Sequence, residues 1–296
     1  MTKTTQRISA DEAIRRLHEI LEKADATPEG AKRKAEAWGQ MGDIHYARRQ
    51  FDLALEARRE HEVPAWRALG DEKMATIALV KAADALAALG RIEEAEKLYR
   101  DEGAATFDRL GDKRAAGITR MALADLWASR GRVAEAEKMY EQQERVFDEI
   151  GEKRERAGAL YRIAELMVRR GHHAGALELL ETDVLAVAVE LGDERWRLGI
   201  LDRAADIHAN LGELRRAVEL RYGQVIPGYD KLGDIRARAW AELKLANDLA
   251  RGGRPRDSVH LLKERVIPAF ERMGLQQDLN SARTLLHTVK RQATQR

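Results

Sequence analysis

Two series of charged residues recur along the chain at intervals of 40 or 41 residues. The acidic series consists of five acids and one amide, at Asp43, Asp84, Asp125, Glu165, Asp206 and Asn247. The basic series stands eleven residues before each of these positions, at Lys32, Lys73, Arg114, Arg154, Arg195 and Arg236. Carboxylates and cations repeated this regularly can bind the charged groups of an extended ligand, or they can pair with each other across neighbouring elements.

Sequence motifs typical of catalysis are missing. The chain contains no Gly-x-x-x-x-Gly-Lys phosphate loop, no Gly-x-Gly-x-x-Gly, no His-Glu-x-x-His and no serine within a Gly-x-Ser-x-Gly turn. It has no cysteine, which excludes a thiolate nucleophile, and His172 and His173 are adjacent, which is poor spacing for two ligands of one metal. We therefore predict that the protein is not an enzyme and binds no cofactor or metal.

Two series of glycines, which recur with the same period as the charged residues, predict the helices that carry those residues. The glycines stand at 70, 111, 151, 192, 233 and 274, and at 90, 131, 171, 212 and 253. Each interval between glycines is long enough for one helix, glycine suits the left-handed residue after a helix, and the Asp or Glu that often follows suits an N-cap. Each repeat is thus predicted to be an antiparallel pair, a first helix (A) and a second helix (B).

Composition agrees with an all-α fold. Aromatic residues make up only 5% of the chain, while Ala, Leu, Glu and Arg, which favour helices, are abundant. Small residues recur at one place in helix A, at Gly42, Ala83, Ala124, Ala164, Ala205 and Ala246, and at another in helix B, beginning with Ala54. Small residues in fixed register let neighbouring helices approach closely.

The spacing of Trp38, Met41, Gly42 and Ala54 resembles the Trp-Leu-Gly…Ala spacing of tetratricopeptide repeats, and the resemblance covers roughly residues 9–292. The chain departs from that family in its period, 41 residues against about 34, and in having Leu-Gly-Asp where the family has a proline. Long repeats of this kind resemble those of polarity scaffolds, kinesin light chains, peptide-pheromone receptors and the sensor regions of STAND-type regulatory ATPases.

The resemblance implies one right-handed superhelical solenoid of about 14 antiparallel helices over residues 9–292. We expect a helix at about 9–24 that caps the array, six full pairs up to about residue 272, and a last helix at about 276–292. Residues 1–8 and 293–296 are predicted to be terminal tails, the former disordered.

In such arrays helix A lines a concave groove, so the resemblance also implies where the charged series lie. Eleven residues are about three helical turns, which places both series on one face of helix A, roughly 16 Å apart. Semi-apolar residues that could anchor a bound segment lie between or just beyond them, at Tyr46, Met121, Tyr161 and Trp240. The alternative interpretation is that acids and bases pair between adjacent helices and hold the register of the array.

The balance of charge indicates the kind of partner. The net charge is only +2, and an acidic series beside the basic one would repel phosphate, which argues against a nucleic-acid binder. The positions of the family's carboxylate clamp read Gly39, Asp43, Lys81, Ile118 and Ala122, which does not match a clamp. A basic or mixed-charge protein segment fits the groove better than an acidic tail.

Three functional hypotheses follow. The first is an interaction scaffold that binds a partner peptide or helix in the groove. The second is a ligand-sensing or regulatory subunit of a larger bacterial assembly, either a peptide receptor or the sensor part of a STAND ATPase or protease system. The third, which the charge disfavours, is a nucleic-acid binder. No apolar run is long enough to span a membrane, and we predict a cytoplasmic protein.

Overall fold

Almost all residues that the structure describes, 9–294, lie in helices, and no strand occurs among them. The computed structural model therefore confirms the all-α prediction. The predicted N-terminal tail, residues 1–8, lies outside the described residues, as do residues 295–296 of the predicted C-terminal tail. The last helix continues to Thr294, two residues beyond its expected end.

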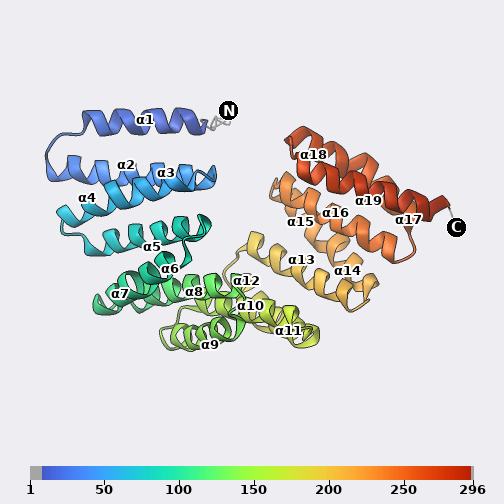
Figure 1. The fold of residues 1–296 in the computed structure, drawn as a ribbon. Helices are drawn as coiled ribbons and strands as arrows, with labels where there is room; N and C mark the ends of the chain where they lie inside the picture. Colours follow the sequence, from blue (N-terminus) through green and yellow to red (C-terminus); the bar gives the residue numbers. More distant parts are fainter. Residues whose placement is uncertain (1–8, 295–296) are drawn as a thin grey trace. The chain divides into compact units, whose positions relative to one another are not determined.

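The chain divides into two compact units, residues 1–155 and 156–296, which are described separately. Unit 1 contains α1 (Ala10–Lys23), α2 (Pro28–Ala47), α3 (Phe51–Glu56), η1 (Ala57–Glu62), α4 (Val63–Ala68), α5 (Glu72–Ala88), α6 (Ile92–Lys97), η2 (Leu98–Ala104), α7 (Ala105–Arg109), α8 (Lys113–Ser129) and α9 (Val133–Glu149). In Figure 1 the helices of this unit, coloured blue to green, follow one another in chain order.

Helix α10 (Lys153–Arg169) begins at the end of unit 1 and lies mostly in unit 2. Unit 2 continues with α11 (His173–Leu179), η3 (Leu180–Val184), α12 (Leu185–Glu190), α13 (Glu194–Asn210), α14 (Leu214–Leu220), η4 (Arg221–Val225), α15 (Ile226–Lys231), α16 (Ile235–Arg251), α17 (Pro255–Leu261), η5 (Leu262–Val266), α18 (Ile267–Met273) and α19 (Gln276–Thr294).

Segments with consecutive ranges, such as α3, η1 and α4, form one continuous helix. Counted this way, residues 9–294 contain fourteen helices, the number predicted from the glycines. The A helices are α2, α5, α8, α10, α13, α16 and α19, and the continuous helices before and between them are the B helices. The first and last helices lie within two residues of their predicted bounds.

The predicted glycines end the helices. All eleven have φ between 64° and 83°, the left-handed region that glycine adopts without a steric cost. At the first such turn the N–H of Asp71 donates to the carbonyl of Trp66 (3.0 Å), and the Asp71 carboxylate then accepts from the N–H of Met74 (2.9 Å) as the N-cap of α5. One Gly-Asp pair therefore ends a helix and begins the next.

Five B helices share an irregularity, a π-helical turn at the same place in the repeat, η1 to η5. A π turn accommodates one extra residue within a helix. The B helix α9 has none, and its 17 residues are one fewer than the 18 residues of the continuous helix at 51–68. The π turn thus explains why glycines that flank a B helix are 21 residues apart, except for Gly131 and Gly151, which are 20 apart.

The core of each unit forms where helices approach at small residues. The alanines of the A-helix series are fully buried, as are those of the B-helix series after Ala54. A buried aromatic residue stands four positions before most glycines that follow a B helix, namely Trp66, Phe107, Phe147, Tyr229 and Phe270, while Ala188 takes this place in one repeat. Each repeat therefore buries its apolar face against its neighbours, as repeat arrays do.

Arg49 is the exception among the turns, because it stands where the repeat calls for glycine and is the one described non-glycine residue with positive φ (61°). A left-handed conformation costs a non-glycine residue about 1–2 kcal/mol. We therefore expect Arg49→Gly to raise the free energy of unfolding by about 1 kcal/mol, measured by urea denaturation. The reciprocal variant Gly90→Arg should lower it, and a destabilised Arg49→Gly protein would contradict this account.

Candidate functional site

The acidic series lies where helix A packs on helix B, and most of its members bind the residue fifteen positions later. Tyr99 Oη donates to Asp84 (2.5 Å) and Tyr140 Oη donates to Asp125 (2.7 Å), while arginines take the same place beside the other two aspartates, in the pairs Asp43–Arg58 and Asp206–Arg221. Where a π turn is present, this partner is its first or second residue. A polar group at a packed interface needs such a partner.

Two members of the acidic series have a leucine fifteen positions later, which cannot form a side-chain hydrogen bond. These two members are also the ones that are not aspartate. Leu180 and Leu262 stand fifteen positions after Glu165 and Asn247. The longer side chain of Glu165 reaches the next A helix, where Arg203 donates from Nε (2.5 Å) and Nη2 (2.9 Å). Aspartate thus occurs in this series only opposite Arg or Tyr, a pairing that is present in the sequence but that the repeat spacing alone does not indicate.

Cations from the next A helix form a second set of partners. Lys81 Nζ lies 2.9 Å from Asp43, and Lys244 Nζ lies 2.9 Å from Asp206, in each case 38 residues later. At the corresponding place after Asp84 the chain has Ala122. Among the described residues, no cation lies within ion-pair distance of Asp84, which leaves this carboxylate with the Tyr99 hydroxyl as its hydrogen-bond donor.

The surroundings of Asp84 are partly buried and aromatic. Burial raises the pKa of Asp84 above the ordinary value, although the Tyr99 hydrogen bond and the charges of Lys81 and Arg58 oppose the shift. Burial and the Asp84 charge together raise the pKa of Tyr99 and, on the exposed side, of Tyr46. A partly buried carboxylate without a paired cation is stabilised more by a cationic ligand than a carboxylate that is already paired with lysine.

Three members of the basic series pair with acids at the start of the next A helix. Lys73 and Arg195 bind the N-cap aspartate of the following A helix, Asp112 and Asp234, each at 2.7 Å. Arg114 in the same way lies 3.3 Å from Glu152. All six basic residues are exposed. The register interpretation therefore applies to these three, and exposed pairs of this kind contribute about 0–1 kcal/mol each.

Unit 2 contains the most heavily charged part of this face. Arg221 is only 1% exposed, and its guanidinium binds Asp202 (2.9 Å), Asp206 and Asp248. Lys244 also binds Asp202, at 2.7 Å. Arg203 Nη1 lies 3.7 Å from Asp206, and burial raises the pKa of Asp248. Each of these charges depends on the others, because a buried charge without a partner is costly.

A hollow of about 410 Å³ opens beside this network, on the A-helix side of unit 2. Helices α13, α16 and α19 line it, and charged or amide side chains predominate on its walls, at Arg203, Asp206, Lys244, Asn247, Asp248 and Arg251. Two residues of the acidic series, Asp206 and Asn247, thus border a concave surface that could hold a short polar segment.

The four predicted apolar anchors differ in exposure. Tyr46 is 41% exposed and Trp240 is 36% exposed, with Trp240 resting edge-on against Phe270. Tyr161 is half-buried. Met121 is 5% exposed, so its prediction as a surface anchor is wrong: its side chain packs into the core. Ile118 was not predicted as an anchor, yet it is exposed and occupies the repeat position of Trp240, seven residues before the acidic series.

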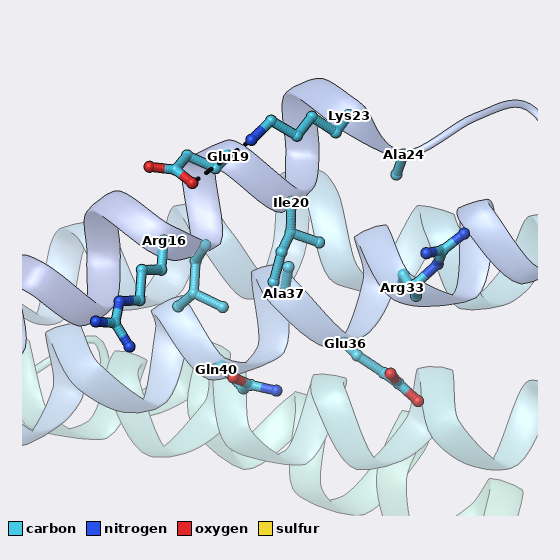
Figure 2. Close-up of a pocket in the computed structure, with 10 residues that line it drawn as sticks. Arg16, Glu19, Ile20, Lys23, Ala24, Arg33, Glu36, Ala37 and Gln40 are labelled. Carbon is cyan, nitrogen blue, oxygen red and sulfur yellow. Dashed lines mark ion pairs between the residues drawn. The ribbon is translucent and has the colours of Figure 1, made fainter.

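A further hollow lies between α1 and α2 in unit 1 (Figure 2) and has a volume of about 470 Å³. Charges of both signs surround the exposed side chain of Ile20, including Lys23, which pairs with Glu19 at 3.7 Å. Neither charged series contributes a residue to it, and no motif in the sequence predicted it.

The described residues contain neither a metal-binding cluster nor a membrane-spanning helix. No group of three His, Cys, Asp or Glu side chains there could hold a metal ion. Within the same residues, no helix combines the length and the apolar character that a membrane span requires.

No protein-family model matches the sequence, and no curated protein matches it. Solved structures do match the fold. The apo quorum sensor NprR from B. thuringiensis superposes with a TM-score of 0.66 at 16% identity, covering 96% of this chain and 77% of that one. A Rap protein complexed with Competence and Sporulation Factor gives 0.61 at 14% identity, covering 100% and 90%.

A third structure is a Signal Transduction ATPase with Numerous Domains from Pyrococcus horikoshii, described as having a tetratricopeptide repeat sensor. Its TM-score is 0.66 at 14% identity, and the match covers 97% of this chain and 44% of that protein. Together with the repeated helix pairs, these likenesses define the class: the chain has the tetratricopeptide-repeat fold, as its residue spacing predicted.

The raised pKa of Asp84 determines how this residue changes the stability of the protein with pH. An acid whose pKa is raised in the folded state loses stability as pH rises from its ordinary value, about 3.9, through the folded value. Asparagine can still accept from Tyr99 but carries no charge. We expect Asp84→Asn to raise the thermal unfolding temperature at pH 7, and the gain to disappear as Asp84 becomes protonated at acidic pH. Glu56→Gln, at an exposed position, is the control, and a gain that persisted in acid would refute the assignment.

The Arg221 network makes a second prediction. Arg221→Leu removes the cation that binds all three carboxylates, which leaves Lys244 beside Asp202 and Asp206 and Arg203 at 3.7 Å from Asp206. The variant should lower the free energy of unfolding by about 3–5 kcal/mol. Adding Asp206→Asn recreates the pairing of Asn247 with Leu262 and should recover part of the loss. Urea denaturation of both variants tests the coupling, and strictly additive effects would show that the residues are independent.

Proposed function

We propose that the protein is an interaction scaffold that binds a segment of a partner protein along the A-helix face. The observation that carries the proposal is the state of Asp84, a half-buried acid beside the exposed ring of Tyr46. Asp43 and Asp206, in the same series, bind a lysine from the next A helix, but Asp84 has Ala122 there. A basic side chain of a ligand would supply the missing charge.

The ligand is inferred from what the face offers. Asp84 favours a lysine or arginine of the bound segment, and the exposed surfaces of Tyr46, Ile118 and Trp240 favour apolar side chains. The hollow in unit 2 presents both signs of charge. A basic or mixed-charge peptide or helix therefore suits this face better than an acidic one.

The alternative is that the same face senses a ligand for a larger bacterial assembly, as a peptide receptor or as the sensor part of a STAND ATPase or protease system. The fold likeness to a quorum sensor, to a Rap protein with a bound factor and to a sensor of a signalling ATPase favours this reading. It predicts an effector encoded nearby or in a longer parent chain.

Other parts of the proposal follow from the same residues. The basic side chains Lys73, Arg114 and Arg195 are occupied by acids of the protein, which argues against a nucleic-acid partner. We infer no enzymatic activity, no cofactor and a cytoplasmic location. Residues 9–292 are taken as one repeat array, because the glycine spacing keeps one phase throughout.

Site-specific photo-crosslinking tests the scaffold. A photoreactive residue at Tyr46 should capture a partner from cells, whereas one at Val189, a more exposed side chain on a B helix, should not. Asp84→Lys should reduce capture at Tyr46 at least about tenfold.

Glu93→Lys reverses the charge of an exposed B-helix residue and should leave capture unchanged. A partner that crosslinks equally from Val189, or that persists in Asp84→Lys, would refute the proposal.

A further inference from the structure

A second hollow in unit 2 lies on the B-helix side and has a volume of about 750 Å³. It opens between the helix formed by α14, η4 and α15 and the one formed by α17 and η5, over residues of α16. Its apolar wall consists of Val218, Ile226, Pro227, Leu245, Leu249 and Leu261. The volume is within the range of small-molecule sites, about 300–1,000 Å³.

The polar group at the base of this hollow is the carboxylate of Glu242, which is only 1% exposed. Arg265 Nη2 approaches its Oε1 at 2.5 Å and Arg238 Nε lies 3.7 Å away, yet neither carboxylate oxygen has a hydrogen bond among the described residues. Burial raises the pKa of Glu242 despite the two arginines. A buried carboxylate of this kind still gains from a well-directed donor.

Packing does not require an acid here. The corresponding position in the other A helices is Trp38, Leu79, Arg120, Leu160, Leu201 and Arg283, none of which is an acid. The place of the Glu242–Arg265 pair is taken in the first repeat by Trp38 and His61, whose rings stack at 3.9 Å. Glu242 is thus a departure from an otherwise mainly apolar position, and it occurs where the chain also leaves a cavity.

The mouth of the hollow carries two exposed side chains from consecutive π turns, a kind of turn frequent at functional sites. Tyr222 in η4 is 74% exposed, and Arg265 in η5 is half-exposed and reaches inward to Glu242. Arg254 and Asp257 at the rim pair with each other at 2.7 Å. Arg265 therefore occupies the place that a cationic ligand would take.

We propose that this hollow binds a small amphiphile with an apolar body and a cationic amine or amidinium head, which displaces Arg265 and donates hydrogen bonds to Glu242. The apolar wall receives the body, and Tyr222 covers it at the mouth. This site uses residues 242, 245 and 249 of α16, whereas the A-helix hollow uses 243, 244, 247, 248 and 251. The inference is independent of the proposed scaffold function.

Isothermal titration calorimetry with three matched probes tests the chemistry. The probes are 4-phenylbutylamine, the neutral 4-phenylbutan-1-ol and the anionic 4-phenylbutanoate. The amine should bind at least about tenfold more tightly than the alcohol, and the anion more weakly than either, because only the amine pairs with Glu242. Equal binding of amine and alcohol, or no binding of the amine, would overturn the proposal.

Variants with opposite expected effects locate the site. Glu242→Gln should weaken amine binding at least about tenfold and leave the alcohol within about twofold. Arg265→Gln removes the competing guanidinium and should strengthen amine binding several-fold. Glu264→Gln, an exposed neighbour in η5, is the matched control and should change neither. Unchanged amine affinity in Glu242→Gln, or weaker affinity in Arg265→Gln, would overturn the proposal even if the other result were as expected.

Discussion

The close approach of helix A to helix B at a small residue constrains everything around it. Ala83 and its equivalents are fully buried, so the acid that follows lies beside a packed interface. It must then find a partner within reach, and the B helix supplies one fifteen residues later. The first repeat shows how tight the contact is: a Cβ on Gly42 would lie 2.6 Å from Arg58 Nε, so glycine leaves room for the arginine that binds Asp43.

The π turns belong to the same arrangement. Arg58, Tyr99 and Arg221, which bind the acidic series, are all at the start of a π turn, and the extra residue there accounts for the length of the B helix. Tyr140 makes the same contact from the regular helix α9. The π turn is therefore not needed for the contact itself, but it alters which side chains the rest of the B helix presents. Tyr222 and Arg265, at the mouth of the B-helix hollow, come from such turns.

Charge is distributed by the same geometry. The near-neutral total conceals two local arrangements: bases near the start of an A helix bind the N-cap acid of the next repeat, and acids farther along bind residues of helix B. These pairs leave few groups unsatisfied. Among residues 9–294, Asp84 has no cation within ion-pair distance and the carboxylate oxygens of Glu242 have no hydrogen bond. Both stand out because the repeat elsewhere mostly places a cation or an apolar residue at those points.

Local rules are strong enough for the sequence alone to determine the helices, their number and their ends. Glycine at a left-handed position and aspartate at an N-cap act within a few residues, and the same glycines and aspartates recur with a period of about 41 residues. The pairing of the acidic series is also present in the sequence, since Asp appears opposite Arg or Tyr and not opposite Leu180 or Leu262, but it became apparent only from the helix packing. Side-chain burial and partner choice were decided only by tertiary packing, because they depend on which residues of distant repeats meet. That packing buries Met121, joins Lys73 to Asp112 rather than to Asp84, and encloses Glu242 beside a cavity.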